Sequence, residues 1–331
     1  MNDNQSVLPD RNVAPSSCYA TAHWIREIGR GAKGARSLSY ADAHELFNAI
    51  IGGKVSELEL GAILIALRIK GESVDEIGGF LAAAQSSFPL LAAPGFDSMP
   101  VVIPSYNGAR RVANLTPLLA MLLARTGMPV LMHGVTEDAG RVTSAEILKA
   151  LGILPAGSIQ EAERQLQQRL PVFMPIEILA PRLAQLLALR KKLGLRNSTH
   201  TLVKILQPFE QPALRLVSYT HPEYALMLAR FFTERAGADR GDVLLMRGTE
   251  GEAVANTRKG QQIDWFHGGQ KTTLAETRTA TDTVLPIPTD AQGTAQWIDA
   301  VLKGNEPVPS NIAEQVSYCV MAAGRRRESV A

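Results

Sequence analysis

A loop that could hold an anion follows a short apolar run near the end of the first third of the chain. Residues 101–103 are Val-Val-Ile, which is typical of a strand buried on both faces, and 104–108 form a turn, Pro-Ser-Tyr-Asn-Gly. A helix is predicted next, capped by Asn114 or Thr116 and ended by Gly127. Unpaired backbone N–H groups and the helix dipole suit such a unit to phosphate. The candidate anion-binding residues are Ser105, Asn107, Gly108, Asn114 and Thr116, with Arg110 and Arg111 in the same loop. The pattern also fits an ordinary strand–loop–helix unit with a solvated arginine pair.

A second candidate for anion binding is the basic segment between positions 180 and 215. It holds seven Lys or Arg residues against one acid, Glu210, in a chain whose formal net charge is only +2. The seven bases are Arg182, Arg190, Lys191, Lys192, Arg196, Lys204 and Arg215. Three of them, at 190–192, end a predicted helix, where cations complement the helix dipole, and this accounts for part of the cluster. Arg196 and Lys204 are not explained in that way.

Few other residues are candidates for catalysis or for metal binding. His133 follows a predicted strand and precedes a glycine, which favours a loop histidine with satisfied hydrogen bonds over a catalytic one, and we count it among the candidate residues of the anion loop. Glu250 and Glu252 are weak candidates for a metal site, because Mg²⁺ prefers carboxylate oxygens. Otherwise we expect no metal.

The elements that must position these residues are of two kinds. Residues 19–93 read as short helices separated by glycines, which enclose little core and should pack on another part of the chain or on a second subunit. Beyond residue 95 strands alternate with helices, which predicts a mixed, mostly parallel sheet. The strand candidates are 100–103, 129–132, 171–174, 214–219 and 242–246, and helices are expected at 181–193, 294–302 and 311–323. Residues 250–290 are expected to form hairpins and loops.

Composition limits the classes of protein to which the chain can belong. The chain has 331 residues, 46% hydrophobic and 20% charged, which is ordinary for a globular protein and long enough for two domains. The two cysteines, Cys18 and Cys319, are far apart, which indicates a reducing compartment and argues against a zinc site. No apolar run is long enough for a membrane span and the N-terminus is polar, so we expect a cytoplasmic protein without a membrane partner.

Several runs of residues, taken in order, resemble one known family. In the helical segment they are Leu-Phe-Asn-Ala-Ile at 46–50 and Ile-Ala-Leu-Arg-Ile-Lys-Gly-Glu at 65–72. Further on they are Met-His-Gly at 132–134, Thr-Ser-Ala-Glu-Ile-Leu-Lys-Ala-Leu-Gly at 143–152, Leu-Gly-Leu-Arg at 193–196 and His-Pro-Glu at 221–223. Over 20–320 the chain is similar to anthranilate phosphoribosyltransferase and its wider fold family of nucleoside phosphorylases, glycosyltransferase family 3.

The resemblance implies an α/β fold class with a small all-helical N-terminal domain and a larger domain around a mixed sheet. It implies a helical dimerisation domain at 19–93 plus about 177–200, and an α/β domain at 94–176 and 201–324. Residues 1–18 would be a flexible tail and 325–331 a frayed basic end. The expected partner is a second copy, bound through the N-terminal helices.

The residues that bind substrate in those transferases differ here. The family's Gly-Thr-Gly-Gly-Asp loop wraps the pyrophosphate of phosphoribosyl pyrophosphate, whereas 104–108 carry bulkier side chains that block close backbone approach. The family's magnesium-binding Asp-Glu pair falls on Ala253 and Val254, and the Lys and Asn that flank its His-Gly fall on Met132 and Val135. We therefore predict no anthranilate phosphoribosyltransferase activity and no cofactor. Residues 104–110 and 196–202 resemble a side branch of the family that binds DNA or RNA.

The sequence thus predicts a sequence-independent nucleic-acid-binding protein with a basic cleft that contacts the phosphate backbone. The candidate contacts are Arg110, Arg111, Arg190, Lys191, Lys192, Arg196 and Lys204. One alternative is an active phosphoribosyltransferase or related glycosyltransferase with an altered acceptor, which would need Mg²⁺ and phosphoribosyl pyrophosphate. Another is a regulatory module that senses a nucleotide at the altered loop.

Overall fold

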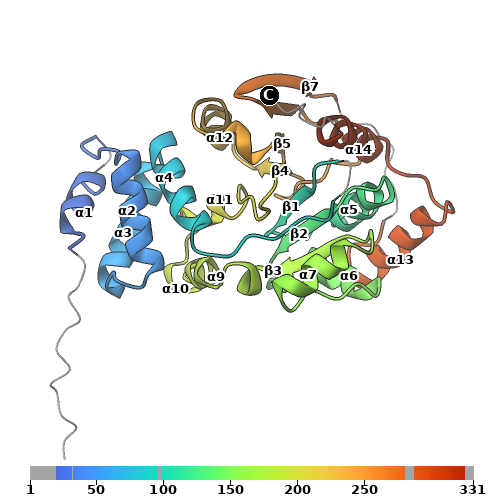
Figure 1. The fold of residues 1–331 in the computed structure, drawn as a ribbon, viewed down its shortest axis with the longest axis horizontal. Coiled ribbons are helices and arrows are strands. Elements are labelled where there is room, and N and C mark those ends of the chain that lie inside the picture. The colour runs from blue at the N-terminus through green and yellow to red at the C-terminus, as the bar shows by residue number, and fades with distance from the viewer. Residues whose placement is uncertain (1–19, 32, 96–97, 280–286, 325–331) are drawn as a thin grey trace, which may run out of the picture.

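The computed structural model describes residues 20–31, 33–95, 98–279 and 287–324 (Figure 1). The expected tails at 1–18 and 325–331 lie outside these residues. The described chain forms a group of helices at one end and a sheet covered by helices at the other (Figure 1).

Four helices make up the N-terminal end, and serines cap three of them. They are α1 (Ala22–Ile28), α2 (Tyr40–Ile51), α3 (Glu57–Lys70) and α4 (Val74–Gln85). The side chains of Ser39, Ser56 and Ser73 accept hydrogen bonds from backbone N–H groups in the first turns of α2, α3 and α4. The prediction of short helices within 19–93 is confirmed for the described residues. The N-terminal helices therefore form a small helical domain of the kind that the resemblance implies.

Seven strands form one sheet in the order β3-β2-β1-β4-β5-β6-β7. They are β1 (Val101–Ser105), β2 (Val130–Gly134), β3 (Val172–Pro175), β4 (Leu214–Tyr219), β5 (Val243–Arg247), β6 (Ile263–His267) and β7 (Gln270–Ala275). The first five in the sheet pair in parallel, and the last two pairings are antiparallel. All five predicted strands are confirmed, and β6 with β7 supplies the hairpin expected within 250–290. The fold class is thus the predicted one, a helical domain plus a mostly parallel mixed sheet.

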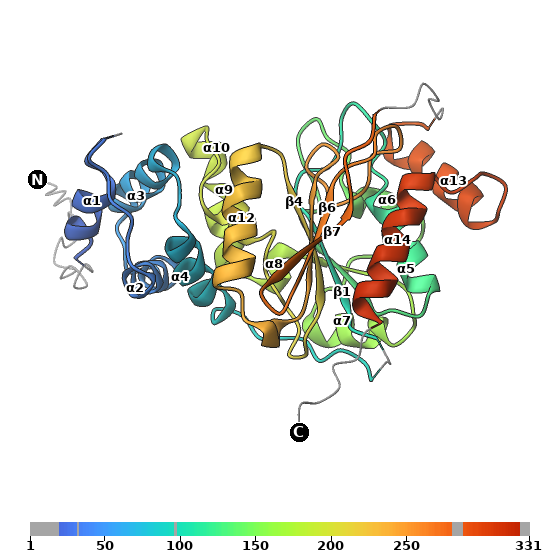
Figure 2. The same cartoon turned by 90° about the horizontal axis from the view of Figure 1, so that it is seen from above.

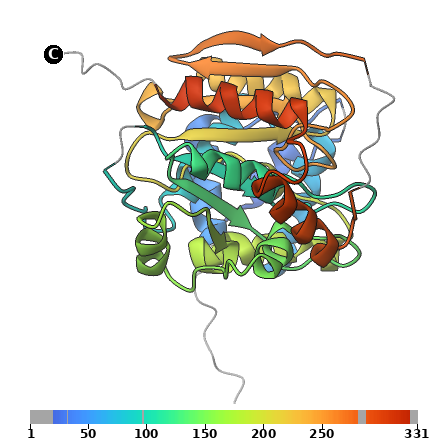
Figure 3. The ribbon, with the colours of Figure 1, turned by 90° about the vertical axis from the view of Figure 1, so that its right-hand side faces the viewer.

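Both faces of the parallel part of the sheet are buried because successive strand residues point to opposite cores. Val101 and Ile103 join one core, with α5 (Thr116–Arg125), α6 (Ser144–Ala150), α13 (Ala291–Leu302) and α14 (Ser310–Ala323). Val102 joins the other, with α7 (Ile159–Leu166), α8 (Ile176–Leu179), α9 (Pro181–Ala188), α11 (Thr199–Leu202) and α12 (Pro222–Glu234). Figure 2 shows α5, α13 and α14 on one side of the strands and α9 and α12 on the other. In Figure 3 the β6–β7 hairpin runs along the top edge of the molecule.

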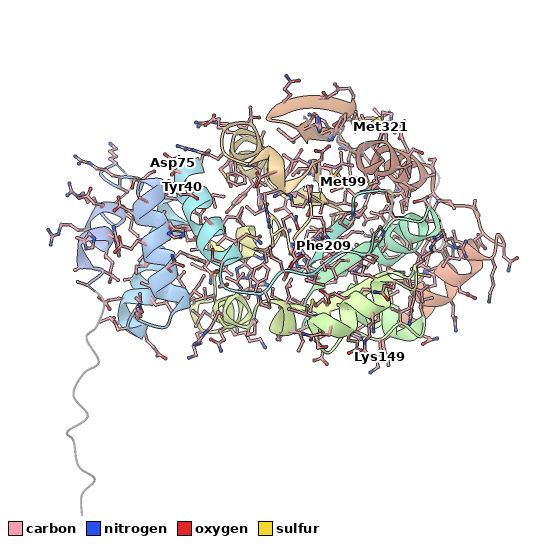
Figure 4. All side chains as sticks on the ribbon, in the orientation of Figure 1. Tyr40, Asp75, Met99, Lys149, Phe209 and Met321 are labelled. Carbon is pink, nitrogen blue, oxygen red and sulfur yellow. The ribbon has the colours of Figure 1, made fainter. Side chains whose placement is uncertain are left out.

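The second core continues from the sheet into the helical end. Residues of α2, α3 and α4 belong to the same buried cluster as those of α9 and α12, so the N-terminal helices do pack on the rest of the chain. Phe209, fully buried, lies between the two ends (Figure 4).

Two sequence predictions were wrong in detail. The N-cap of α5 is Leu115, not Asn114 or Thr116, although the side chain of Asn114 accepts a hydrogen bond from the backbone N–H of Thr116. The single helix expected at 181–193 is divided at Leu189 into α9 and α10 (Arg190–Leu193). Among the described helices, none is both long and apolar enough to cross a membrane.

Candidate functional site

β1 and β4 are neighbours in the sheet, and the strand order reverses between them. The chain runs from β1 to β2 and β3 on one side and from β4 to β5 on the other. Because parallel strands direct their carboxyl ends to one edge, such a reversal opens a crevice that commonly binds ligands. The anion loop predicted after β1 therefore lies where the fold favours a site.

The anion loop is filled by carboxylates of the same chain. Oε1 of Glu252 accepts hydrogen bonds from the backbone N–H groups of Asn107 and Gly108, each at 2.8 Å. The two carboxylate oxygens of Glu250 accept from the backbone N–H groups of Arg110, at 2.6 Å, and Arg111, at 2.9 Å. Glu252 is only 1% exposed, so its charge is desolvated and held by these donors. Four N–H groups that could have held a phosphate are thus already paired.

The predicted anion-binding side chains mostly hold the loop in place. The hydroxyl of Ser105 donates to Ser144, at 2.8 Å, and the amide of Asn107 donates to the Gly251 carbonyl, at 2.6 Å. Asn114 donates to Ser144, at 3.1 Å, and the Thr116 hydroxyl lies 3.5 Å from Glu252. All four predicted side chains are buried.

His133 is the fourth residue of β2 rather than a loop histidine. Its Nδ1 lies 2.7 Å from the Tyr106 hydroxyl, and its Nε2 is buried without a partner among the described residues. Burial lowers the pKa of His133 to about 3, so the ring is neutral at pH 7 and the Tyr106 hydroxyl can donate to Nδ1. The expectation of a fully satisfied histidine was therefore wrong for one nitrogen.

The structure brings several basic side chains together beside this loop. The Arg196 guanidinium donates to Oδ1 of Asn107, at 2.7 Å, and Nζ of Lys204 donates to the Gly251 carbonyl, at 3.0 Å. The pKa of Arg196 is lowered first by burial and then by the charges of Arg190, Arg141 and Arg68, while Asp138 opposes them. We call Arg68, Arg141, Arg190, Arg196 and Lys204 the basic cluster.

Two members of the basic cluster were not among the predicted contacts. Arg68 lies on α3 and Arg141 in the loop before α6, and only the fold brings them near Arg196. Arg141 also donates to the Gly108 carbonyl, at 3.2 Å, and lies 3.7 Å from the Glu250 carboxylate. No local pattern in the sequence links these positions.

The other predicted bases lie in different surroundings. Lys191 and Lys192 are exposed on α10 beside Arg190, and the side chains of Arg110 and Arg111 are exposed. Arg215 is buried in β4 with its guanidinium 5.7 Å from the Phe232 ring, so it does not belong to the basic cluster. Arg182 donates to Gln185 on α9.

A cavity of about 100 Å³ opens between α3, α11 and the start of α12. Its walls include Arg68, Glu72, Arg196, His200, Lys204 and Tyr224. Burial, followed by the charge of Arg196, lowers the pKa of His200 to about 4, so its ring is neutral at pH 7. Burial likewise lowers the pKa of Lys204 to about 8, while Glu252 opposes that shift.

Neither pyrophosphate nor Mg²⁺ fits the residues present. The backbone N–H groups that would hold pyrophosphate are bound by Glu252 and Glu250, and both carboxylates are committed to them. Ala253 and Val254, at the family's metal positions, are buried and apolar. Among the residues that the structure describes, no three His, Cys, Asp or Glu side chains gather as metal ligands.

Comparisons with known proteins agree with the fold. Residues 22–88 match the model of the glycosyl transferase family, helical bundle domain. The protein YbiB of Escherichia coli (strain K12), described as uncharacterized, is 45% identical over 91% of this chain and 93% of its own length. The anthranilate phosphoribosyltransferase of Methylocella silvestris is 32% identical over 56% of this chain, which spans about half (51%) of that enzyme.

Solved structures share the fold at low identity. Anthranilate phosphoribosyltransferase from Thermus thermophilus superposes with a TM-score of 0.66 at 20% identity, covering 91% of this chain and 89% of that one. The Saccharomyces cerevisiae enzyme in complex with PRPP and Mg gives 0.64 at 14% identity, covering 91% and 86%.

Fold and sequence together define an anthranilate phosphoribosyltransferase-like protein of glycosyl transferase family 3. Within that class, the chain belongs to the same family as YbiB of Escherichia coli.

Proposed function

We propose that this protein binds nucleic acids without sequence preference, through the basic cluster on a transferase scaffold that has lost its pyrophosphate site. Two observations made at the same crevice support the proposal. The backbone donors suited to a small buried pyrophosphate are occupied by Glu252 and Glu250. Burial first, and then the positive charges of Arg190, Arg141 and Arg68, lower the pKa of Arg196, so these cations repel one another in the same crevice.

A polyanion relieves that repulsion better than a small ligand does. Closely spaced cations concentrate a positive potential, and phosphates placed between them neutralise it while releasing counterions from the nucleic acid. Glu250, 3.7 Å from Arg141, and Glu252, which opposes the lowering of the Lys204 pKa, offset only part of the charge of the five cations. Contacts to phosphate rather than to base edges carry no sequence information.

Salt dependence of binding tests this proposal. On duplex DNA, each member of the basic cluster that contacts a phosphate should add about −0.9 to the slope of the logarithm of affinity against the logarithm of salt concentration. Binding can be measured by fluorescence anisotropy with a DNA duplex, a duplex of scrambled sequence and an RNA of the same length. The two duplexes should give equal slopes of affinity against salt concentration. Interaction that is insensitive to salt would overturn the proposal.

Matched lysine variants test where the nucleic acid lies. Replacing Lys191 and Lys192 on α10 by Gln should weaken binding to all sequences and reduce the slope by about one per lost contact. The control replaces Lys149 and Lys303 by Gln, which removes the same charge from exposed lysines near the opposite face of the sheet (Lys149 in Figure 4). If both pairs have the same effect, only the net charge matters and the proposed position is wrong.

We also propose that two copies associate through α3. Its exposed side bears Leu58, 85% exposed, and Ile69, 70% exposed, with Ala62 and Ile65 between them on the same face. A contiguous apolar stripe of this kind on a surface helix indicates a binding partner, and a second copy would present two basic clusters to one nucleic acid.

A further inference from the structure

The cavity between α3, α11 and α12 has more cationic than anionic groups. Arg68, Arg196 and Lys204 line it, and Glu72 is the one acid of its lining. The Glu72 carboxylate accepts a hydrogen bond from the Ser198 hydroxyl, at 2.5 Å, and burial raises its pKa. The cavity is therefore an electropositive pocket rather than a neutral one.

Each of the three cations retains unused donors. Lys204 makes one hydrogen bond through Nζ within the described chain, to the Gly251 carbonyl, although an ammonium has three N–H groups. Arg196 donates to Asn107 through one terminal nitrogen, and Arg68 donates to the Tyr224 hydroxyl through one. A guanidinium has five N–H groups, so both arginines can donate further.

The start of α12 forms part of the same wall. Residues 219–221, which link β4 to α12, line the cavity. The helix has 13 residues, and its N-cap residue, His221, makes no side-chain cap hydrogen bond. In the first turn Pro222 has no N–H group and the N–H of Tyr224 donates to the His221 carbonyl, at 3.1 Å, so this end of the helix favours an anion chiefly through the helix dipole.

We propose that this pocket binds a phosphate monoester, presented as the terminal phosphate of a nucleic-acid strand or as a free nucleotide. The inference rests on the proposed function and specifies which part of the nucleic acid enters the crevice. A monoester carries about −1.5 to −2 charges and three terminal oxygens, which matches three cations opposed by one acid. An internal phosphodiester is linked on two sides and cannot enter a pocket of about 100 Å³ end-on. One water needs about 10–15 Å³, so the pocket has room for a phosphoryl group.

The first test compares two oligonucleotides that differ only in carrying a 5′-phosphate or a 5′-hydroxyl. The unmodified protein should bind the phosphorylated strand about tenfold more tightly, the effect of one or two charge-assisted hydrogen bonds. Lys204→Met should bring the ratio of the two affinities close to one. Lys149→Met, the same change at an exposed lysine outside the cavity, should preserve the ratio. The comparison in the unmodified protein needs no variant, so a poorly folded Lys204→Met protein does not remove the test.

A second measurement separates this inference from the proposed function. Binding of adenosine monophosphate can be detected as a rise in the melting temperature of the protein. Adenosine monophosphate should raise the melting temperature of the unmodified protein but not that of Lys204→Met. Adenosine, which has no phosphate, should raise neither. If both oligonucleotides bind equally and with steep salt dependence, nucleic-acid binding stands and the monoester pocket is wrong. If neither oligonucleotide binds, the proposed function is wrong. In that case the proposed monoester pocket is supported only if adenosine monophosphate binds the unmodified protein and not Lys204→Met.

Discussion

Oε1 of Glu252 lies 2.8 Å from the backbone nitrogen of Asn107, and the same oxygen lies 2.8 Å from that of Gly108. A side-chain carboxylate thus occupies the place that the fold offers to a phosphate oxygen. The carboxylate carries the charge that the loop's donors favour, so the loop remains folded without a ligand.

Removing the Glu252 carboxylate should destabilise the protein. In Glu252→Ala two buried backbone N–H groups lose their acceptor, which should reduce the free energy of unfolding by about 3 kcal/mol, and Glu252→Gln, which keeps one acceptor oxygen, by about half of that. Urea denaturation followed by circular dichroism measures both. Glu210→Ala, at an exposed position, should change the value by less than about 0.5 kcal/mol. Equal stability of Glu252→Ala and the parent would show that the loop does not depend on this residue.

Anthranilate and phosphoribosyl pyrophosphate with Mg²⁺ should give no product above background. The reason is that the pyrophosphate donors are paired and the metal positions are occupied by Ala253 and Val254. The fluorescence decrease of anthranilate provides the assay, with an active anthranilate phosphoribosyltransferase as positive control. Turnover that disappears in Glu252→Ala while the variant remains folded would establish the transferase alternative instead.

Stability should rise with pH in a way that depends on Lys204. The ordinary lysine pKa is 10.5 and burial lowers it to about 8 in the folded protein, so between these values the unfolded chain binds more protons. The free energy of unfolding therefore increases from about pH 8 towards pH 10.5. Urea denaturation at pH 7.5 and pH 9.5 should show that the parent gains stability relative to Lys204→Met, which lacks the titrating group. A constant difference between the two proteins would mean that Lys204 keeps its ordinary pKa.

Charges on the exposed stripe of α3 should separate the two copies. The double variant Leu58→Glu and Ile69→Glu should sediment as a monomer at micromolar concentration, where the parent should be a dimer, because burying unpaired carboxylates is costly. Leu226→Glu provides the control, since Leu226 is 71% exposed on α12, away from the stripe. A monomeric parent, or a double variant that still dimerises, would exclude this interface.

The sheet could be predicted closely because its parallel strands are short apolar runs bounded by turns. The strand expected at 214–219 is β4 to the residue, and the others differ by one or two positions. The individual strands of the β6–β7 hairpin were not predicted, because β7 is polar and largely exposed. A usable signal was present in Gly268-Gly269, both with positive φ, since such a pair forms a two-residue hairpin turn.

The separate segments of the candidate site could be predicted from the sequence, but the contacts between those segments could not. The anion loop, Arg196 and Lys204 were recognised from local sequence. The partners of the loop are Glu250 and Glu252, which were interpreted as weak metal candidates, and nothing local indicates that they reach back to Asn107. Arg68 and Arg141 joined the basic cluster only through the packing of α3 and of the loop before α6. Contacts between distant segments depend on the whole fold, and the sequence alone does not rank them.

The bond between Glu252 and Asn107 joins residues 145 positions apart, and this separation sets an order of events during synthesis. At about 5–20 residues per second, a ribosome needs roughly 7–30 s to proceed from one to the other. Throughout that interval the nascent loop has four unpaired amide groups and no carboxylate to hold them. The N-terminal half is therefore synthesised before its loop can close, and this loop is among the last parts of the chain to reach its final form.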